Sequence, residues 1–162
     1  MKWTPFLATI IGSLGMSSGE VPQFRAETID PDIKIGYGLT IGDVDGDGRV
    51  DILMADQFDI VWYENPTWAK HVIASKLTLK DNVCIVARDL DGDGKVEIAV
   101  GANWNPGNTI SRRESGSVHY LIAPEDRTQR WKVVRLPNEP TVHRMHWILP
   151  KTVQPALVVV PL

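Results

Sequence analysis

A short acidic segment occurs twice in this chain, and this repeat restricts the possible folds more than any other sequence feature. The first copy spans residues 42–52 and the second spans residues 88–98, an offset of 46 residues. Each copy follows one apolar stretch and precedes another, so each is predicted to join two short β-strands. Internal repetition at this spacing is typical of proteins built from similar structural units.

Further apolar stretches extend each copy into a larger unit. The second unit carries an insertion at residues 103–115, which is rich in Gly, Asn, Ser and Pro. About four antiparallel strands in roughly 45 to 55 residues is the size of one β-propeller blade. The predicted strands are 39–41, 52–54, 60–63 and 70–73 in the first unit, and 83–87, 98–100, 118–121 and 132–135 in the second.

A third unit begins near residue 140, with predicted strands at 142–148 and 156–160 and no acidic residue between them. The sequence therefore predicts an all-β fold: a partial β-propeller of about two and a half four-stranded blades. The blades are placed at about 34–80, about 81–137 and, truncated, about 140–162. A propeller needs about four blades to close. We therefore expect missing C-terminal blades in a longer protein, or self-assembly with other copies.

The repeated segment has the composition of a calcium-binding loop. Aspartates alternate with small residues, and glycines allow the backbone to curl around an ion. Calcium takes six to eight oxygen ligands from carboxylates and carbonyl groups. We predict such loops between the first and second strands of blades 1 and 2. The predicted ligands are Asp43, Asp45, Asp47, Asp51 and the Arg49 carbonyl in the first loop, and Asp89, Asp91, Asp93, Glu97 and the Lys95 carbonyl in the second.

The repeated segment has three alternative interpretations besides a strand-flanked calcium loop. An EF-hand requires a glutamate at position 12 of the loop, where this chain has Met54 and Val100, each within a predicted strand. Magnesium is disfavoured because it prefers water ligands and strict octahedral geometry. A solvated acidic turn without any ion is the third alternative, and it does not account for two nearly identical copies.

The N-terminus and the composition indicate where the protein acts. Residues 1–18 contain Lys2, an apolar run at 6–14 and then small residues, the order of a secretory signal peptide. We expect a secreted, periplasmic or cell-envelope protein; the alternative is a buried N-terminal segment. No later stretch has the length of a membrane span. The net charge of -3 gives no basic surface for nucleic acid, and the single cysteine, Cys84, excludes an intramolecular disulfide.

Residues on the first strand of each blade line the channel of a propeller, so they are candidates for chemistry. His143 is predicted as a base, with Arg144 as its charge partner, for an elimination next to a carbonyl group. His119 and His146 are weaker candidates, and a structural role for all of them is the alternative. The other candidates are Tyr37, Asp81 and Asn82 on first strands, and Trp62, Tyr63, Trp68, Trp104, Trp131 and Trp147, which could stack on sugars or fill the core between blades.

Residues 43–52, 61–66 and 89–100 resemble the FG-GAP or VCBS repeat family. This resemblance implies seven-bladed propellers that are often secreted or on cell surfaces, with structural calcium in their loops. Residues 81–106, 116–121 and 139–147 resemble, more narrowly, bacterial relatives of aldos-2-ulose dehydratase. That family joins a propeller to cupin domains and dehydrates anhydro-sugars with metal assistance.

Two functions follow as hypotheses. The first is an exported calcium-binding segment that acts as a structural module or binds a carbohydrate or protein ligand. The alternative is a fragment of a sugar lyase, cleaving a carbon–oxygen bond at the propeller channel.

Overall fold

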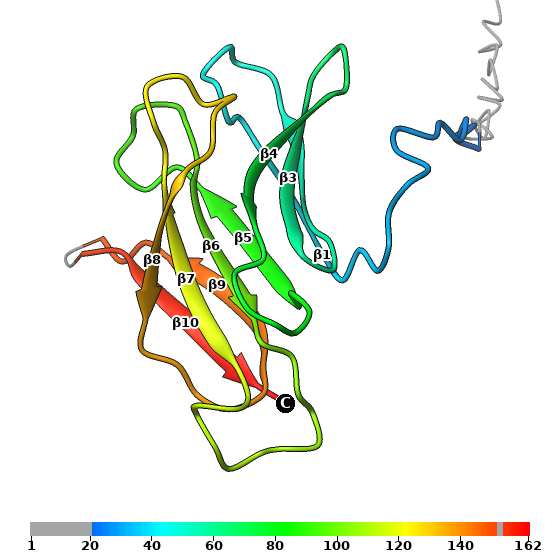
Figure 1. Ribbon diagram of the computed structural model, residues 1–162. Helices are drawn as coiled ribbons and strands as arrows, with labels where there is room; N and C mark the ends of the chain where they lie inside the picture. The colour runs from blue at the N-terminus through cyan, green and yellow to red at the C-terminus, as the bar shows by residue number, and fades with distance from the viewer. Residues whose placement is uncertain (1–20, 152–153) are drawn as a thin grey trace, which may run out of the picture.

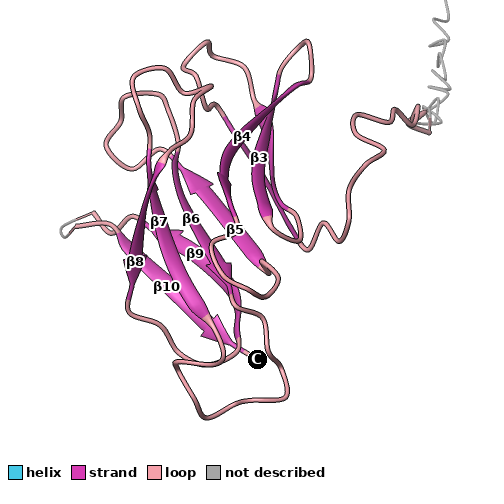
Figure 2. Cartoon of the chain, viewed as in Figure 1, coloured by secondary structure: helices cyan, strands magenta, loops and turns pink. Residues whose placement is uncertain are grey.

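The computed structural model describes residues 21–151 and 154–162, and all regular elements in these residues are β-strands (Figures 1 and 2). The all-β prediction is therefore confirmed. The predicted signal segment, residues 1–18, lies outside the described residues. Within the described ranges, no helix has the length and hydrophobicity needed to cross a lipid bilayer. The strands are β1 (Gly38–Gly42), β2 (Asp51–Ala55), β3 (Asp59–Glu64), β4 (Ala69–Ser75), β5 (Cys84–Arg88), β6 (Glu97–Ala102), β7 (Ser117–Ile122), β8 (Lys132–Leu136), β9 (Val142–Ile148) and β10 (Ala156–Pro161).

These strands form three antiparallel sheets, none of which closes on itself. Sheet 1 has the order β1-β2-β3-β4, sheet 2 has the order β5-β6-β7-β8, and sheet 3 consists of β9 and β10. The first two sheets repeat the same register, since Leu39 pairs with Met54 in sheet 1 and Ile85 pairs with Val100 in sheet 2. Every strand expected from the repeat is present near its predicted position.

The first strand of each sheet lies next to the first strand of the neighbouring sheet. β1 contacts β5, and β5 contacts β9 (Figure 1). Each of these strands is hydrogen-bonded to one neighbour within its own sheet. The three sheets therefore stack face to face with their inner edges side by side, which is compatible with a repeat fold of the kind that the sequence indicates.

Two apolar layers hold the sheets together, because alternate side chains of each strand point to opposite faces. One layer lies between sheets 1 and 2, and the other lies between sheets 2 and 3. Cys84 is buried in the second layer, as the sequence predicts. The buried residues of the first layer include Leu53, Ile60, Trp62, Ile73, Ile98, Val100, Leu121 and Trp131, and those of the second include Val83, Ala99, Val118, Val142 and Met145.

A segment before β1, residues 29–36, covers the outer face of sheet 1. Ile29 packs against the cluster that contains Tyr63 on this face. The Asp30 carboxylate accepts hydrogen bonds from the Tyr63 hydroxyl and the Lys70 ammonium group, both at 2.7 Å. The hydrogen bond from Lys70 makes the largest contribution and that from Tyr63 the next, and together they lower the pKa of Asp30 to about 2. The segment is therefore attached to sheet 1 by both apolar and charged contacts.

The same segment fixes the path of the chain into β1. The buried Asp56 carboxylate accepts hydrogen bonds from the backbone N–H groups of Lys34, Ile35 and Gly36, at 2.7–3.1 Å. These bonds lower the pKa of Asp56, although its burial acts in the opposite direction. Tyr37 follows directly after Gly36, so the Asp56 carboxylate sets its position at the start of the inner edge.

Candidate metal loops and a hollow at the inner edge

The two acidic loops lie at the same end of the stacked sheets (Figure 1). The first joins β1 to β2 and the second joins β5 to β6. Both therefore connect a first strand to a second strand, as predicted. In each loop the glycines adopt the left-handed backbone conformation, with φ of +86° at Gly46 and +84° at Gly92. A side chain is rarely accommodated there, so glycine is needed for the loop to turn.

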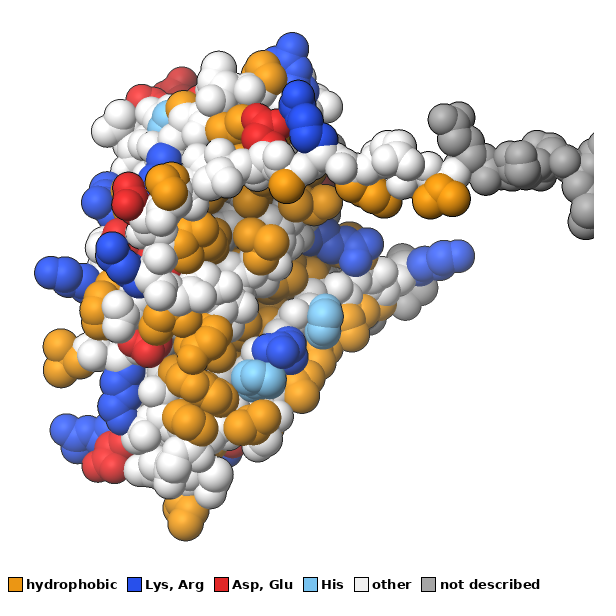
Figure 3. All heavy atoms as spheres, turned by 90° about the vertical axis from the view of Figure 1, so that its right-hand side faces the viewer, with side chains coloured by type: hydrophobic (Ala, Val, Ile, Leu, Met, Phe, Trp, Pro, Cys, Tyr) orange, Lys and Arg blue, Asp and Glu red, His pale blue; other side chains and the backbone are white. Residues whose placement is uncertain are grey.

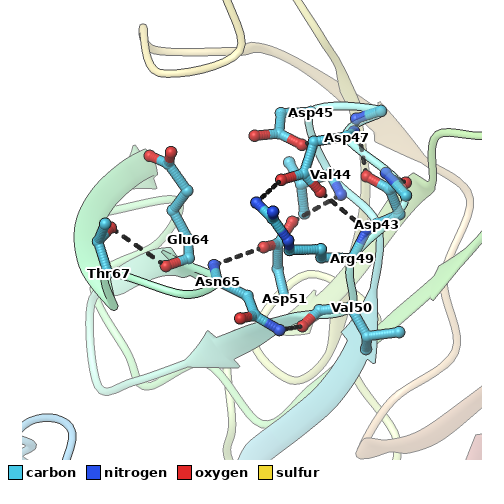
Figure 4. Close-up of polar contacts among 12 residues, drawn as sticks. Asp43, Val44, Asp45, Asp47, Arg49, Val50, Asp51, Glu64, Asn65 and Thr67 are labelled. Atoms are coloured by element: carbon cyan, nitrogen blue, oxygen red, sulfur yellow. Dashed lines mark hydrogen bonds and ion pairs between the residues drawn. The ribbon is translucent and has the colours of Figure 1, made fainter.

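In the first loop, aspartate side chains accept hydrogen bonds from the backbone of the turn itself (Figure 4). Asp43 Oδ1 accepts from the Gly46 N–H at 2.7 Å, and Asp43 Oδ2 accepts from the Gly48 N–H at 2.8 Å. Asp45 Oδ1 accepts from the Asp47 N–H at 3.0 Å. These bonds hold the first two predicted ligands on the inside of the turn.

The second loop repeats this bonding residue by residue. Asp89 Oδ1 accepts from the Gly92 N–H at 2.7 Å, and Asp89 Oδ2 accepts from the Gly94 N–H at 3.0 Å. Asp91 Oδ1 accepts from the Asp93 N–H at 3.1 Å. The sequence repeat is therefore also a repeat of loop geometry.

The last acidic position of the first loop is deeply buried. Asp51 is 1% exposed, and its carboxylate accepts hydrogen bonds from the Val44 N–H at 2.8 Å and the Asn65 N–H at 2.9 Å. Burial raises the pKa of Asp51 above its usual value, and the neighbouring Asp45 and Asp43 carboxylates raise it further. A cation between these groups would relieve this repulsion and stabilise the ionised form.

The equivalent position of the second loop, Glu97, makes the same backbone contact. Its Oε2 accepts a hydrogen bond from the Leu90 N–H at 2.8 Å. Burial is the main cause that raises the pKa of Glu97, and the charges of Asp91 and Asp93 act in the same direction. Both loops thus bring carboxylates together at an electrostatic cost when no cation is present.

Each loop gathers three carboxylates whose oxygen atoms lie within 4.8 Å of one another. The groups are Asp43, Asp45 and Asp51 in the first loop, and Asp89, Asp91 and Asp93 in the second. Glu97 is not part of the second group, and Asp47 is not part of the first. Asp47 instead forms an ion pair with Arg49, at 3.0 Å between Oδ2 and Nη1 (Figure 4). Oxygen-only clusters of this kind suit a hard cation such as calcium.

The two loops also contact each other, which the sequence pattern did not indicate. The Asp43 carbonyl accepts a hydrogen bond from the Val96 N–H at 2.9 Å. Lys95 lies so close to Gly46 that a Cβ atom there would be 2.5 Å from the Lys95 Cε. Gly46 therefore serves the turn and also lies against Lys95 of the second loop, whose side chain would have to move to admit a Cβ atom at this position.

A second candidate site is a hollow at the inner edge of the sheets. It encloses about 310 Å³ and is lined by Tyr37, Val83, Trp104, His143 and Arg144. A neighbouring hollow of about 250 Å³ runs along residues of β1, β5 and β9. Figure 3 shows a face of the molecule on which histidine and basic side chains lie next to apolar side chains.

The contacts of His143 and Arg144 fix the protonation of the histidine ring. The His143 ring stacks on the Trp104 ring, with centroids 5.5 Å apart. Arg144 Nη1 donates hydrogen bonds to His143 Nε2 at 3.1 Å and to the His143 carbonyl at 3.0 Å. A guanidinium group only donates, so Nε2 accepts and Nδ1 carries the ring proton. Burial lowers the pKa of His143, and the charge of Arg144 lowers it further by a smaller amount. The ring is therefore neutral at pH 7.

The hollow brings together Tyr37, His143 and Arg144 but not the other predicted first-strand residues. The Asp81 carboxylate accepts a hydrogen bond from Gln57 Nε2 at 3.2 Å. Asn82 is 1% exposed and donates to the Asp56 carbonyl at 2.9 Å. Both residues therefore support the chain turn before β5, and they do not line the hollow.

The remaining candidates divide between core and surface. His119 is 4% exposed in β7, and its Nε2 lies 3.0 Å from Ser117 Oγ. His146 lines the neighbouring hollow. Trp62 and Trp131 are buried in the layer between sheets 1 and 2, which is the core role that the sequence left as an alternative to sugar stacking.

Comparison with known families gives one match. The model of the FG-GAP-like repeat family matches residues 43–100, which run from the first acidic loop through the second and into β6. This match supports an FG-GAP repeat in that part of the chain. Searches of curated proteins and of solved structures found no match, so the narrower resemblance to aldos-2-ulose dehydratase relatives is not confirmed.

Proposed function

We propose that this chain is an exported, calcium-binding segment of FG-GAP or VCBS repeats that acts as a structural and ligand-binding module. The main support is the identical hydrogen bonding of the two acidic loops, at equivalent places in two equivalent sheets. The family match across residues 43–100 adds to it. Export rests on the signal-like order of residues 1–18 and on the abundance of calcium outside cells.

In this proposal Asp43, Asp45 and Asp51 hold one calcium ion, and Asp89, Asp91 and Asp93 hold the second. The bound ion supplies positive charge that offsets the repulsion between carboxylates. Each site ties the end of a first strand to the start of a second strand. Calcium would therefore stabilise the hairpins β1–β2 and β5–β6, whose first strands line the neighbouring hollow of about 250 Å³ together with β9.

Thermal unfolding tests the proposal. Saturating calcium stabilises a folded protein by about 2.7 kcal/mol per site at a concentration one hundred times the Kd. We expect Tm to rise by roughly 5–10 °C per site for a domain of this size. Asp45→Asn and Asp91→Asn should each remove about half of the total rise, because each removes one ligand charge from one loop.

Asp32→Asn provides a matched control, because Asp32 is exposed and lies in neither loop. It should leave the calcium-dependent rise intact. Magnesium at the same concentration should give a much smaller rise, since it binds fewer protein oxygens. An equal rise in the wild type and in the double variant Asp45→Asn/Asp91→Asn would contradict the proposal.

The sugar-lyase alternative receives less support from the geometry. It requires His143 to accept a proton from a substrate. His143 Nε2 already accepts a hydrogen bond from Arg144, and Nδ1 carries the proton. This arrangement favours ligand binding over proton abstraction, and ligand binding is the function that we propose for this edge.

A further inference from the structure

We propose that the hollow at Tyr37, Trp104, His143 and Arg144 binds the carboxylate of an acidic sugar, a hexuronate. This inference deepens the ligand-binding part of the proposed function and rests on it. It depends on three features of the hollow: the unpaired edge of one guanidinium group, a lining without acidic residues, and aromatic side chains beside unpaired strand edges.

The first feature is the orientation of Arg144. Its Nη1 uses both hydrogens on His143, one to the ring and one to the carbonyl. Nε and Nη2 donate to no group among the residues that the structure describes. These two nitrogens form one edge of the planar guanidinium, and such an edge matches the two oxygens of a carboxylate. His143 thus holds Arg144 in place and leaves its bidentate edge open.

The second feature is the charge of the surroundings. No aspartate or glutamate lines either the hollow or its neighbour. Arg144 is the only charged side chain in both linings, in a protein whose net charge is -3. An anion in the hollow therefore meets one positive charge and no carboxylate among the residues that line it. The lining favours an anionic ligand over a neutral or cationic one.

The third feature suits a polyhydroxylated ring. Trp104 and Tyr37 supply aromatic surface, and the Tyr37 side chain is 55% exposed. The neutral His143 ring offers its Nδ1–H as a donor. β1, β5 and β9 each pair with one strand only, so one edge of each strand carries backbone N–H and C=O groups without a strand partner. Such groups hydrogen-bond sugar hydroxyls while the aromatic rings contact the apolar face of the sugar.

Titration of the calcium-loaded protein with sodium D-glucuronate tests this inference, followed by NMR of backbone amides and the Arg144 Nε–H. We expect saturable shifts centred on Tyr37, Trp104 and Arg144. D-glucose, which lacks the carboxylate, and acetate, which lacks the ring, should each bind about tenfold more weakly or worse. Each charge-assisted hydrogen bond contributes about 1.5–3 kcal/mol, which is at least about tenfold in affinity.

Two substitutions separate charge from geometry. Arg144→Gln should weaken glucuronate binding about tenfold or more, and Arg144→Lys should recover only part of it, since lysine lacks the bidentate edge. Arg130→Gln makes the same charge change at an exposed turn between β7 and β8 and should leave binding unchanged. The amide spectra of all variants report whether they remain folded.

Equal affinity for glucuronate and D-glucose would overturn the inference, as would unchanged binding in a folded Arg144→Gln. Acetate binding as tightly as glucuronate would also overturn it, because the site would then be a simple anion site. Calcium binding is measured in a separate titration without sugar. Loss of glucuronate binding with calcium binding intact therefore counts against the hollow alone, and loss of calcium binding counts against the proposed function.

Discussion

Replacing Trp62 with alanine is expected to lower the free energy of unfolding by about 3–5 kcal/mol. Trp62 is fully buried in the layer between sheets 1 and 2, in the same cluster as Ile98 and Leu121 of sheet 2. Its ring also stacks on His71, with centroids 4.5 Å apart. Removing the indole leaves a cavity where the two sheets meet, and a close-packed layer relaxes only partly around such a cavity.

Urea denaturation of the purified variants measures this loss. Trp62→Phe should cost less than alanine, because it fills much of the volume and removes an indole N–H that has no hydrogen-bond partner among the described residues. Leu79→Ala serves as the surface control, since Leu79 is 99% exposed, and it should change stability by no more than about 0.5 kcal/mol. A similarly small change for Trp62→Ala would show that sheets 1 and 2 do not pack as described.

Acidification from pH 7 to pH 4 is expected to destabilise the metal-free protein by about 3 kcal/mol through His119 alone. Burial is the main cause that lowers the pKa of His119, and the charge of Arg135 adds to it. Together they bring this pKa to about 4, from an ordinary value of 6.5. The unfolded chain therefore binds this proton more readily than the folded protein. Stability falls as the pH drops below about 6.5, and this contribution levels off below about pH 4.

Comparison with His119→Gln isolates this contribution from that of the carboxylates. The variant should lose less stability than the wild type between pH 7 and pH 5, by about 2 kcal/mol. His146→Gln, at an exposed position of β9, should follow the wild-type pH profile. Measuring all three in a chelator keeps metal binding out of the comparison. Parallel profiles for the wild type and His119→Gln would contradict the buried, neutral state of His119.

The strand pattern of this protein was predictable from its sequence because the information is local. Apolar stretches and the acidic loops mark the strands, and the predicted strand 60–63 lies in β3, where all four of these residues are buried. Glycines in the loops mark left-handed turns, and Gly46 and Gly92 adopt that conformation. Repetition strengthened each assignment, since two copies of a unit must satisfy the same register.

The contacts within the candidate sites were less predictable because they join residues far apart in the chain. Trp104 follows β6 and His143 lies in β9, and no sequence spacing indicates that their rings stack. The ion pair of Asp47 with Arg49, in contrast, joins residues only two positions apart, and Asp47 does not belong to the first carboxylate group. Tertiary packing therefore determines which of the predicted residues lie together in the candidate sites.

Calorimetric titration of the metal-free protein with calcium tests the central claim most directly. The account predicts about two calcium ions per chain, one per acidic loop, with one ion remaining in Asp45→Asn and one in Asp91→Asn. Asp32→Asn should retain both. A folded wild-type protein that takes up no calcium would contradict the claim, and so would a folded Asp45→Asn/Asp91→Asn double variant that still binds two ions.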